Sequence, residues 1–286
     1  MPDKLNTVRS LLPIFLLLSG AVAASGQSLT PAQAQALVAR ALATESRAAG
    51  DQSHPMRYQL RKTTPRLTST KEMIETREGN VARLIAIDDR PLSPAEERRE
   101  EARLDALLSD PSLQQQRKKS EDGDLVRALH VLRVLPQAFL YQFAGTAATP
   151  TGTVEKFTFK PNPHFAPPDL ETGVMTAMSG ELWIDAAQER VVRLEGHLLQ
   201  DKDFGWGILG QLDKGGWIVI DQADVGGHQW RIVHLRLVMN FRILFKTRNS
   251  DSEQEFTHFA SLPVGLDYRQ AIQMLRSGPS GAGPGH

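Results

Sequence analysis

The sequence contains no cysteine. Disulfide bonds, cysteine metal ligands and thiol chemistry are therefore excluded, and so is the lipid anchor that bacterial lipoproteins carry on a cysteine at the cleavage point. The formal net charge at pH 7 is zero, because 33 lysines and arginines balance 33 aspartates and glutamates. This balance gives no reason to expect a nucleic-acid partner or a strong electrostatic attraction to anionic lipid.

Long apolar runs are also missing, except for a short one near the N-terminus. Residues 11–18 are almost all apolar and follow the basic residues Lys4 and Arg9, while Ala21-Val22-Ala23 has the pattern of a cleavage site. We therefore expect a secretory signal peptide at 1–23, a soluble mature protein in the periplasm, and no membrane-spanning segment after cleavage. The alternative is an uncleaved N-terminal anchor, which the short core and Pro13 disfavour.

Motifs of known active sites are not found either. The sequence has no Gly-x-Ser-x-Gly elbow, no phosphate-binding loop and no His-Glu-x-x-His zinc motif. His228 and His234 would share one face of a strand but lie about 20 Å apart, too far to bind one metal ion. Asp201 and Asp203 form a candidate carboxylate pair, although their setting favours a turn. We therefore expect no enzyme activity, no catalytic residue, no metal site and no cofactor.

The clearest positive pattern is an alternation of apolar and mostly polar residues that ends at Phe245. A period of two predicts a β-strand with one apolar and one largely solvated face. The apolar, odd-numbered members of the tract are Val233, Leu235, Leu237, Met239, Phe241, Ile243 and Phe245. A single strand over 228–248 would extend about 65–70 Å. We therefore expect it to bend, to break at a bulge, or to curl with a strongly wrapped sheet.

Capping and turn signals divide the rest of the chain. Thr30 with Gln33, and Ser93 with Glu96, are capping boxes that predict helices. The second box opens a helical insertion at about 93–135, and Leu266 to Leu275 predicts a closing helix. Further strands are expected at 57–64, 68–78, 81–88, 138–146, 152–160, 181–186, 190–200, 215–225 and 252–260.

These elements predict the fold class α+β. We expect a long, strongly curved antiparallel sheet, that is, an open and incomplete β-barrel with helices packed on its concave side. The prediction is one domain over 24–276, followed by a disordered tail at 277–286 that is rich in glycine, proline and serine.

The segment from Asp203 to Trp217 alternates glycine with large apolar residues. Two interpretations stay open: a plug folded under the sheet, which is favoured, or an apolar patch that contacts another molecule. The candidate contact residues are Phe204, Trp206, Ile208, Leu209 and Trp217.

Three stretches resemble a known family, namely GELWID at 180–185, RVVRLEG at 190–196 and DFGWG at 203–207. Together with the layout of the elements, they are similar to the LolA/LolB-like superfamily of periplasmic lipoprotein carriers and receptors, in an uncharacterised branch that is outer-membrane lipoprotein-sorting-like. The resemblance implies an open β-barrel around an apolar cavity that holds acyl chains, with helices as a lid. The helices at 93–135 and the proline-rich loop at 161–168 depart from the family pattern. No functional arginine of the carriers aligns with a residue of this chain.

We therefore expect an exported protein that binds an apolar ligand (an acyl chain, a lipid or a lipoprotein) in a barrel cavity, in envelope lipid or lipoprotein trafficking and outer-membrane biogenesis. The expected lining is the apolar set of the 233–245 tract together with Leu182, Ile184, Val192, Leu194, Ile218 and Ile220. The alternative is an envelope sensor or interaction module with a filled core, whose partner is an envelope membrane protein.

Overall fold

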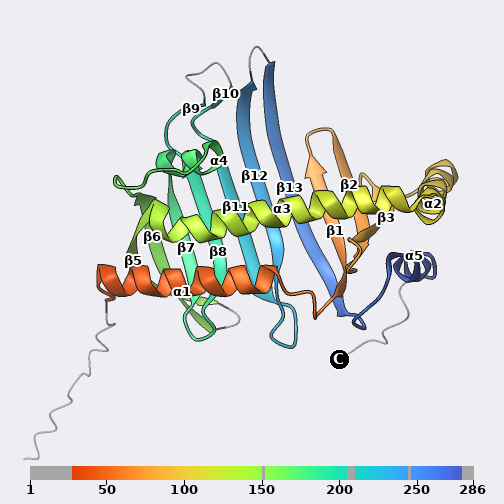
Figure 1. The fold of residues 1–286 in the computed structure, drawn as a ribbon, viewed down its shortest axis with the longest axis horizontal. Helices are drawn as coiled ribbons and strands as arrows, with labels where there is room; N and C mark the ends of the chain where they lie inside the picture. Colours follow the sequence, from red (N-terminus) through yellow and green to blue (C-terminus); the bar gives the residue numbers. More distant parts are fainter. Residues whose placement is uncertain (1–27, 150–151, 205–209, 244–245, 279–286) are drawn as a thin grey trace, which may run out of the picture.

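The computed structural model describes residues 28–149, 152–204, 210–243 and 246–278. Its centre is one antiparallel sheet of 13 strands, in the order β4-β3-β2-β1-β13-β12-β11-β8-β7-β6-β5, with β10 paired to β12 and β9 paired to β10 (Figure 1). The strands are β1 (Met56–Thr64), β2 (Leu67–Ile74), β3 (Val81–Ile87), β4 (Arg90–Pro91), β5 (Phe139–Thr149), β6 (Gly152–Pro161), β7 (Met178–Asp185), β8 (Arg190–Leu198), β9 (Lys202–Phe204), β10 (Gly210–Leu212), β11 (Trp217–Asp224), β12 (Trp230–Ile243) and β13 (Lys246–Ser261). The order begins at β4 and ends at β5, so the sheet is not closed.

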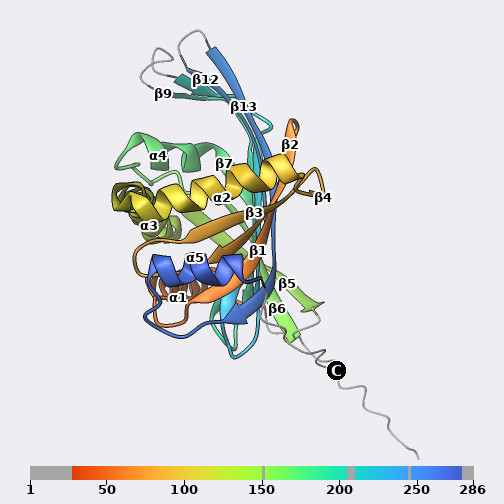
Figure 2. The ribbon, with the colours of Figure 1, turned by 90° about the vertical axis from the view of Figure 1, so that its right-hand side faces the viewer.

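The main helices lie on one side of the sheet, which bends toward them (Figure 2). They are α1 (Pro31–Ala49), α2 (Pro94–Ser109), α3 (Pro111–Ala138), α4 (Leu170–Gly173), the 3-10 helix η1 (Val174–Ala177) and α5 (Tyr268–Arg276). The capping boxes predicted at Thr30 and Ser93 are formed, and Asp267 forms a third one with Gln270. In the described part of the chain, none of these helices is both long and apolar enough to cross a bilayer.

The predicted fold class is confirmed: the chain is α+β, with a large, open, curved antiparallel sheet and helices on its concave side. The helical insertion corresponds to α2 and α3. These two helices meet at Asp110, whose carboxylate accepts the backbone N–H of Ser112 and so caps the start of α3.

The expectation of one strand over 228–248 is wrong. Strand β12 ends at Ile243 and β13 begins at Lys246, and these two residues oppose each other in the antiparallel ladder. The chain therefore reverses direction inside the expected strand, and the strand expected at 252–260 is the second part of β13. Phe245 lies outside the described residues, and for Ile243 only the backbone is described.

Two bulges shift the predicted alternation. In the β11–β12 pair, Ile232 opposes Gln222 while His234 opposes Asp221, so Val233 has no partner in the register. Val192 of β8 also has no partner in the register with β7, because Arg193 opposes Trp183 and Val191 opposes Ile184. A bulge inserts one extra residue into a strand. The residues before the bulge therefore point to the opposite face from the one that strict alternation predicts.

The segment from Asp203 to Trp217 contains two short strands that were not predicted. Short strands β9 and β10 pair with each other, and β10 also pairs with β12, where Leu212 opposes Phe241. Trp217 is the first residue of β11, where it opposes His197 on one side and Val238 on the other. The short helices α4 and η1, which follow the proline-rich loop, were not predicted.

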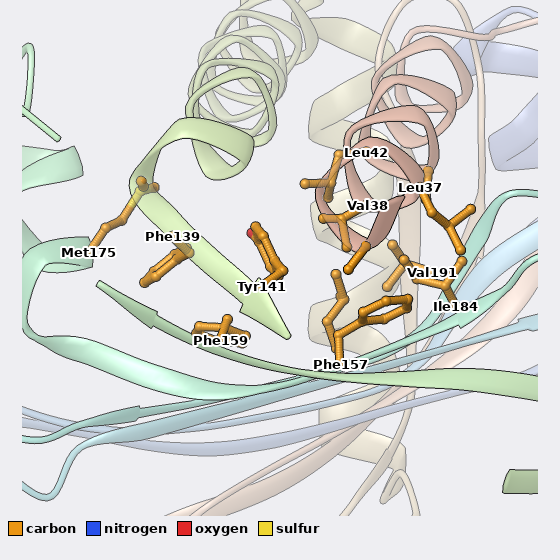
Figure 3. Close-up of a cluster of buried hydrophobic side chains, with 14 residues drawn as sticks. Leu37, Val38, Leu42, Phe139, Tyr141, Phe157, Phe159, Met175, Ile184 and Val191 are labelled. Atoms are coloured by element: carbon orange, nitrogen blue, oxygen red, sulfur yellow. The ribbon is translucent and has the colours of Figure 1, made fainter. Parts of the chain in front are cut away.

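The buried apolar residues form three clusters. In the main one, Leu37, Val38 and Leu42 of α1 pack onto the sheet around Phe157 and Val191 (Figure 3). A second cluster joins α2 and α5 to β2 and β3, and its members include Ile74, Val81, Leu104, Ile272 and Leu275. A third lies beside η1 and contains Ala177, Leu198, Leu212 and Met239.

Candidate ligand-binding cavity

A cavity of about 570 Å³ lies between the helices α1 and α3 and the inner face of the sheet. Leu182, Leu194 and Ile220 line it from the sheet side, and the antiparallel register places them next to one another on three adjacent strands, β7, β8 and β11. The volume falls within the roughly 300–1,000 Å³ that is usual for small-molecule pockets. The sheet thus supplies a continuous apolar wall.

Helix α3 supplies the opposite wall. Leu125, Ala128, Leu132 and Leu135 all line the cavity. Their spacings of three and four residues place them on one face of a helix. Val126, by contrast, is 66 % exposed on the same helix, so only one face of α3 contributes to the cavity.

A buried ion pair holds α1 over the sheet at one side of the cavity. Arg190 at the start of β8 donates from Nε and Nη2 to the two carboxylate oxygens of Glu45, at 2.8 and 2.9 Å, and the backbone N–H of Val191 donates to the same carboxylate. The Arg190 guanidinium also lies 5.4 Å from the centre of the Trp230 ring. Glu45, Arg190, Val191 and Trp230 all line the cavity.

The cavity rim is polar and is formed partly by the turn between β2 and β3. Glu75 accepts the backbone N–H of Met56 at 3.0 Å, and Glu121 of α3 accepts that of Asn80 at 2.9 Å. Burial raises the pKa of both carboxyl groups above the ordinary glutamate value. An amphiphilic space results, with apolar walls and ionisable groups at the rim.

The predicted lining residues divide into several groups. Leu182, Leu194 and Ile220 line the cavity, and Leu182 is also a member of the main core cluster. Ile184 belongs to the same cluster but not to the described lining. Met239 belongs to the third cluster, beside η1, and Leu237 and Phe241 pack against that cluster. Ile218 and Leu235 are paired with residues of the inner face but do not belong to the described cavity lining.

Val192 and Val233 are the two residues that the bulges leave unpaired, and neither belongs to the described lining; Val191 and Ile232 line the cavity instead. The part that any of these residues plays in binding a ligand remains a prediction.

Sequence reasoning missed the contribution of the helices and of the rim. A helical stripe from Leu125 to Leu135 was visible in the sequence, yet it did not show that this stripe faces a cavity. Nothing in the sequence indicated that Glu75 and Glu121, 46 positions apart in the numbering, would line the same space.

The candidate contact residues of the 203–217 segment are not part of the described cavity lining. Trp206, Ile208 and Leu209 lie outside the described residues, as does the side chain of Phe204. Trp217 packs against the guanidinium of Arg236, 5.4 Å from the ring centre. Because Trp217 precedes Ile218 on a strand, its side chain points to the opposite face. The choice between a plug and a contact patch stays open.

A Ser-His-Asp group beside the rim does not have the geometry of a catalytic relay. Both Ser53 Oγ and Asp51 Oδ2 lie 2.9 Å from the same ring nitrogen, Nδ1 of His54. A relay needs the serine and the aspartate on different nitrogens. Within the described ranges, no group of three or more histidine or acidic side chains is placed to hold a metal ion.

Comparisons with known proteins give little further information. No model of a protein family and no curated protein sequence matches the chain. Among solved structures, a "putative outer membrane lipoprotein-sorting protein domain" from Vibrio parahaemolyticus is similar at 10 % sequence identity and a TM-score of 0.31, covering 86 % of this chain and 100 % of that one. A TM-score this low shows no shared function.

Proposed function

We propose that the protein binds an amphiphile and holds its apolar chain in the cavity between α1, α3 and the sheet. The observation that carries the proposal is the cavity itself, with its apolar walls on β7, β8, β11 and α3. Each buried CH₂ contributes about 0.8 kcal/mol, so an acyl chain of about a dozen carbons supplies roughly 10 kcal/mol before the costs of association. Such a site requires an apolar cavity of suitable shape that excludes water, and it does not require reactive groups.

The cellular role proposed is that of a carrier for lipids or lipoprotein acyl chains in the cell envelope. It rests on the secretory signal expected at 1–23, which would deliver the chain to the periplasm. The alternative, a sensor or interaction module with a filled core, is less well supported because about 570 Å³ beneath the helices is not filled by side chains.

Native mass spectrometry and titration with a fluorescent fatty acid test this proposal. We expect lipid to co-purify with the protein from a double-membraned host, and the fluorescent probe to be taken up. Leu132→Trp on α3 fills the cavity and should abolish uptake, whereas Val126→Trp places the same side chain on the exposed face of the same helix and should leave uptake unchanged.

Two outcomes would contradict the proposal. One is the absence of both co-purifying lipid and probe uptake. The other is equal uptake by Leu132→Trp and Val126→Trp, since the site would then lie outside this cavity.

A further inference from the structure

Polar and apolar residues of the cavity lining separate along helix α3. Lys118, Glu121 and Asp122 line the cavity from the first half of the helix, whereas every lining residue of the second half, from Leu125 to Leu135, is apolar. Helix α3 crosses the strands from the side of β3 toward β5 (Figure 1). The cavity therefore has a polar end beside β2 and β3 and an apolar end farther along the helix.

The polar end is open to solvent. Here the turn between β2 and β3 meets α3, and the backbone N–H of Asn80 donates to Glu121. Arg77 of this turn and Asp122 of the helix line the cavity and are exposed. A polar headgroup placed at this end would keep its contact with water and avoid the cost of desolvation.

The apolar end is closed by the main buried cluster. Leu42 and Leu182 line the cavity and are also members of that cluster, with only 3 % and 1 % of their surface exposed. Leu135 lines the cavity too and packs against the same cluster. Glu45 and Arg190 also line the cavity, but their charges pair with each other. A chain end that reaches Leu135 therefore meets packed apolar side chains.

Both walls give the same length for the apolar part. From Leu125 to Leu135 the helix rises by ten residues, or about 15 Å. The opposite wall crosses the adjacent strands β7, β8, β11 and β12, with an apolar lining residue on each, namely Leu182, Leu194, Ile220 and Ile232. Three strand spacings of about 4.8 Å give about 14 Å. With C–C bonds of about 1.5 Å, an extended chain advances about 1.25 Å per carbon, so either wall matches about twelve carbons.

The volume of the cavity admits one such chain. A methylene group is about as large as a water molecule, whose share of the liquid volume is about 30 Å³. Twelve carbons then fill about 360 Å³ of the cavity of about 570 Å³. The remaining space is too small for a second chain of this length and is left for part of the headgroup.

We propose that the cavity selects single-chain amphiphiles by length. The chain lies along α3 with its end at Leu135, about twelve carbons fit, and the headgroup stays at the open end beside the turn between β2 and β3. This inference rests on the proposed function and specifies its ligand class and the orientation of the ligand. Carbons beyond this length do not pass the buried cluster, so they remain in water and add no affinity.

Lysophosphatidylcholines with acyl chains of 8 to 16 carbons test the length limit. Their affinities for the full-length protein are measured below the critical micelle concentration, by displacement of the fluorescent fatty acid. We expect the affinity to rise about fourfold per added carbon, as the burial of one CH₂ group predicts, up to about twelve carbons and then to level off.

A two-chain lipid tests the limit on volume. Native mass spectrometry compares the 12-carbon lysophosphatidylcholine with the phosphatidylcholine that carries two such chains. We expect a complex with the first lipid and, at equal concentration, at most about a tenth as much complex with the second.

Substitutions at the two ends of the α3 stripe test the orientation. Leu135→Trp should lower the chain length at which the affinity levels off by two carbons or more and leave the affinity for the 8-carbon chain unchanged, whereas Leu135→Ala should raise that length. Leu125→Trp should weaken binding of all chain lengths by the same factor, because every chain passes this position. Val126→Trp, on the exposed face of the same helix, is the matched control and should leave the series unchanged.

The other outcomes overturn the inference, and only one of them also overturns the proposed function. The length limit is wrong if the affinity rises evenly to 16 carbons in the wild type and in both Leu135 variants. The orientation is wrong if Leu135→Trp weakens all chain lengths and Leu125→Trp weakens only the long ones. Equal complex formation by the one-chain and two-chain lipids contradicts the single-chain assignment. If no lysophosphatidylcholine displaces the probe and the probe itself does not bind, the proposed function fails as well.

Discussion

Glu45 and Arg190 form an ion pair that is almost fully removed from water. Their side chains are 8 % and 11 % exposed, and the contact is bidentate, with a third hydrogen bond from the N–H of Val191. The attraction between such groups is offset by their desolvation, so the pair as a whole contributes modestly. Removal of one partner is different, because the other is left as an uncompensated buried charge.

We therefore expect Glu45→Ala to lower the free energy of unfolding by about 3 kcal/mol. The matched control is Glu189→Ala. Glu189 pairs with Arg40, which lies on α1 as Glu45 does. The side chains of Glu189 and Arg40 are 35 % and 55 % exposed. An exposed pair contributes at most about 1 kcal/mol. Urea denaturation measures both values, and equal losses in the two variants would show that burial of the pair does not matter.

His234 lies between Asp221 and Glu253 on the outer face of the sheet, with a ring nitrogen 3.0 Å from each. Burial opposes its protonation, but the hydrogen bonds to the two carboxylates outweigh burial and raise the pKa of His234 above the ordinary 6.5. A histidine whose pKa is higher in the folded protein stabilises it fully below pH 6.5, and loses that contribution as the pH rises through the folded value.

The protein should consequently lose stability as the pH rises above about 6.5, and His234→Gln should lose less over the same interval. Because these side chains are partly exposed, we expect the difference to stay below about 1 kcal/mol. Urea denaturation of both proteins at several pH values measures it. A parallel pH dependence in the two proteins would show that His234 is not the group that titrates.

At the scale of elements, β7 and β8 approach each other through a pair of glycines. Gly180 opposes Gly196 in the register, and the ring of Phe159 from β6 lies against both. A Cβ at Gly180 would lie 1.8 Å from the carbonyl oxygen of Glu195, a backbone atom that cannot move alone. An aromatic side chain across a glycine pair replaces the packing that the glycines do not supply.

Gly180→Ala should therefore force the two strands apart and lower the free energy of unfolding by about 2–3 kcal/mol. Ser179→Ala, one position earlier on the same strand, removes only a hydroxyl and should change stability by less than about 0.5 kcal/mol. Urea denaturation distinguishes the two. A Gly180→Ala variant as stable as Ser179→Ala would mean that the strands are farther apart in solution.

Most elements could be predicted from sequence because their signals are local. The capping boxes at Thr30 and Ser93 mark helix starts, and alternation marks the strands. The reversal between Ile243 and Lys246 could not be predicted, because Leu244-Phe245 offers no glycine, asparagine, aspartate or proline. The bulges at Val192 and Val233 have no compositional signal either.

The candidate site was less predictable, because it depends on which faces meet. Alternation placed Leu182, Leu194 and Ile220 on one apolar face, and they line the cavity. The same face continues to Met239, but there the space is filled by η1 and Leu198 rather than left open. Whether an apolar face encloses a cavity is decided by the helices packed on it, and a strand pattern does not contain that information.

At the scale of the whole molecule, one open sheet connects all three buried clusters. Helices α2 and α5 pack around Leu104 and Ile272 on β2 and β3, near one edge of the sheet, and η1 packs around Ala177 against residues of β8, β10 and β12. Helices α1 and α3 cover the cavity. The unfilled volume reduces dispersion contacts and hence stability, so a side chain that fills it should stabilise the fold and compete with the ligand.

Ile220→Phe tests this trade-off, since Ile220 lies on the cavity side of a central strand. We expect the free energy of unfolding to rise by about 1 kcal/mol, as is usual for cavity-filling substitutions, and the affinity for the fluorescent fatty acid to fall about tenfold, equivalent to about 1.4 kcal/mol. Val219→Phe is the matched control, because Val219 is the preceding residue, on the opposite face, and only 4 % exposed. It should destabilise the protein by about 1–3 kcal/mol through overpacking and leave the cavity unchanged. If Ile220→Phe destabilised the protein as much as Val219→Phe while uptake stayed normal, the space beneath α3 would be closed in solution and the ligand would bind elsewhere.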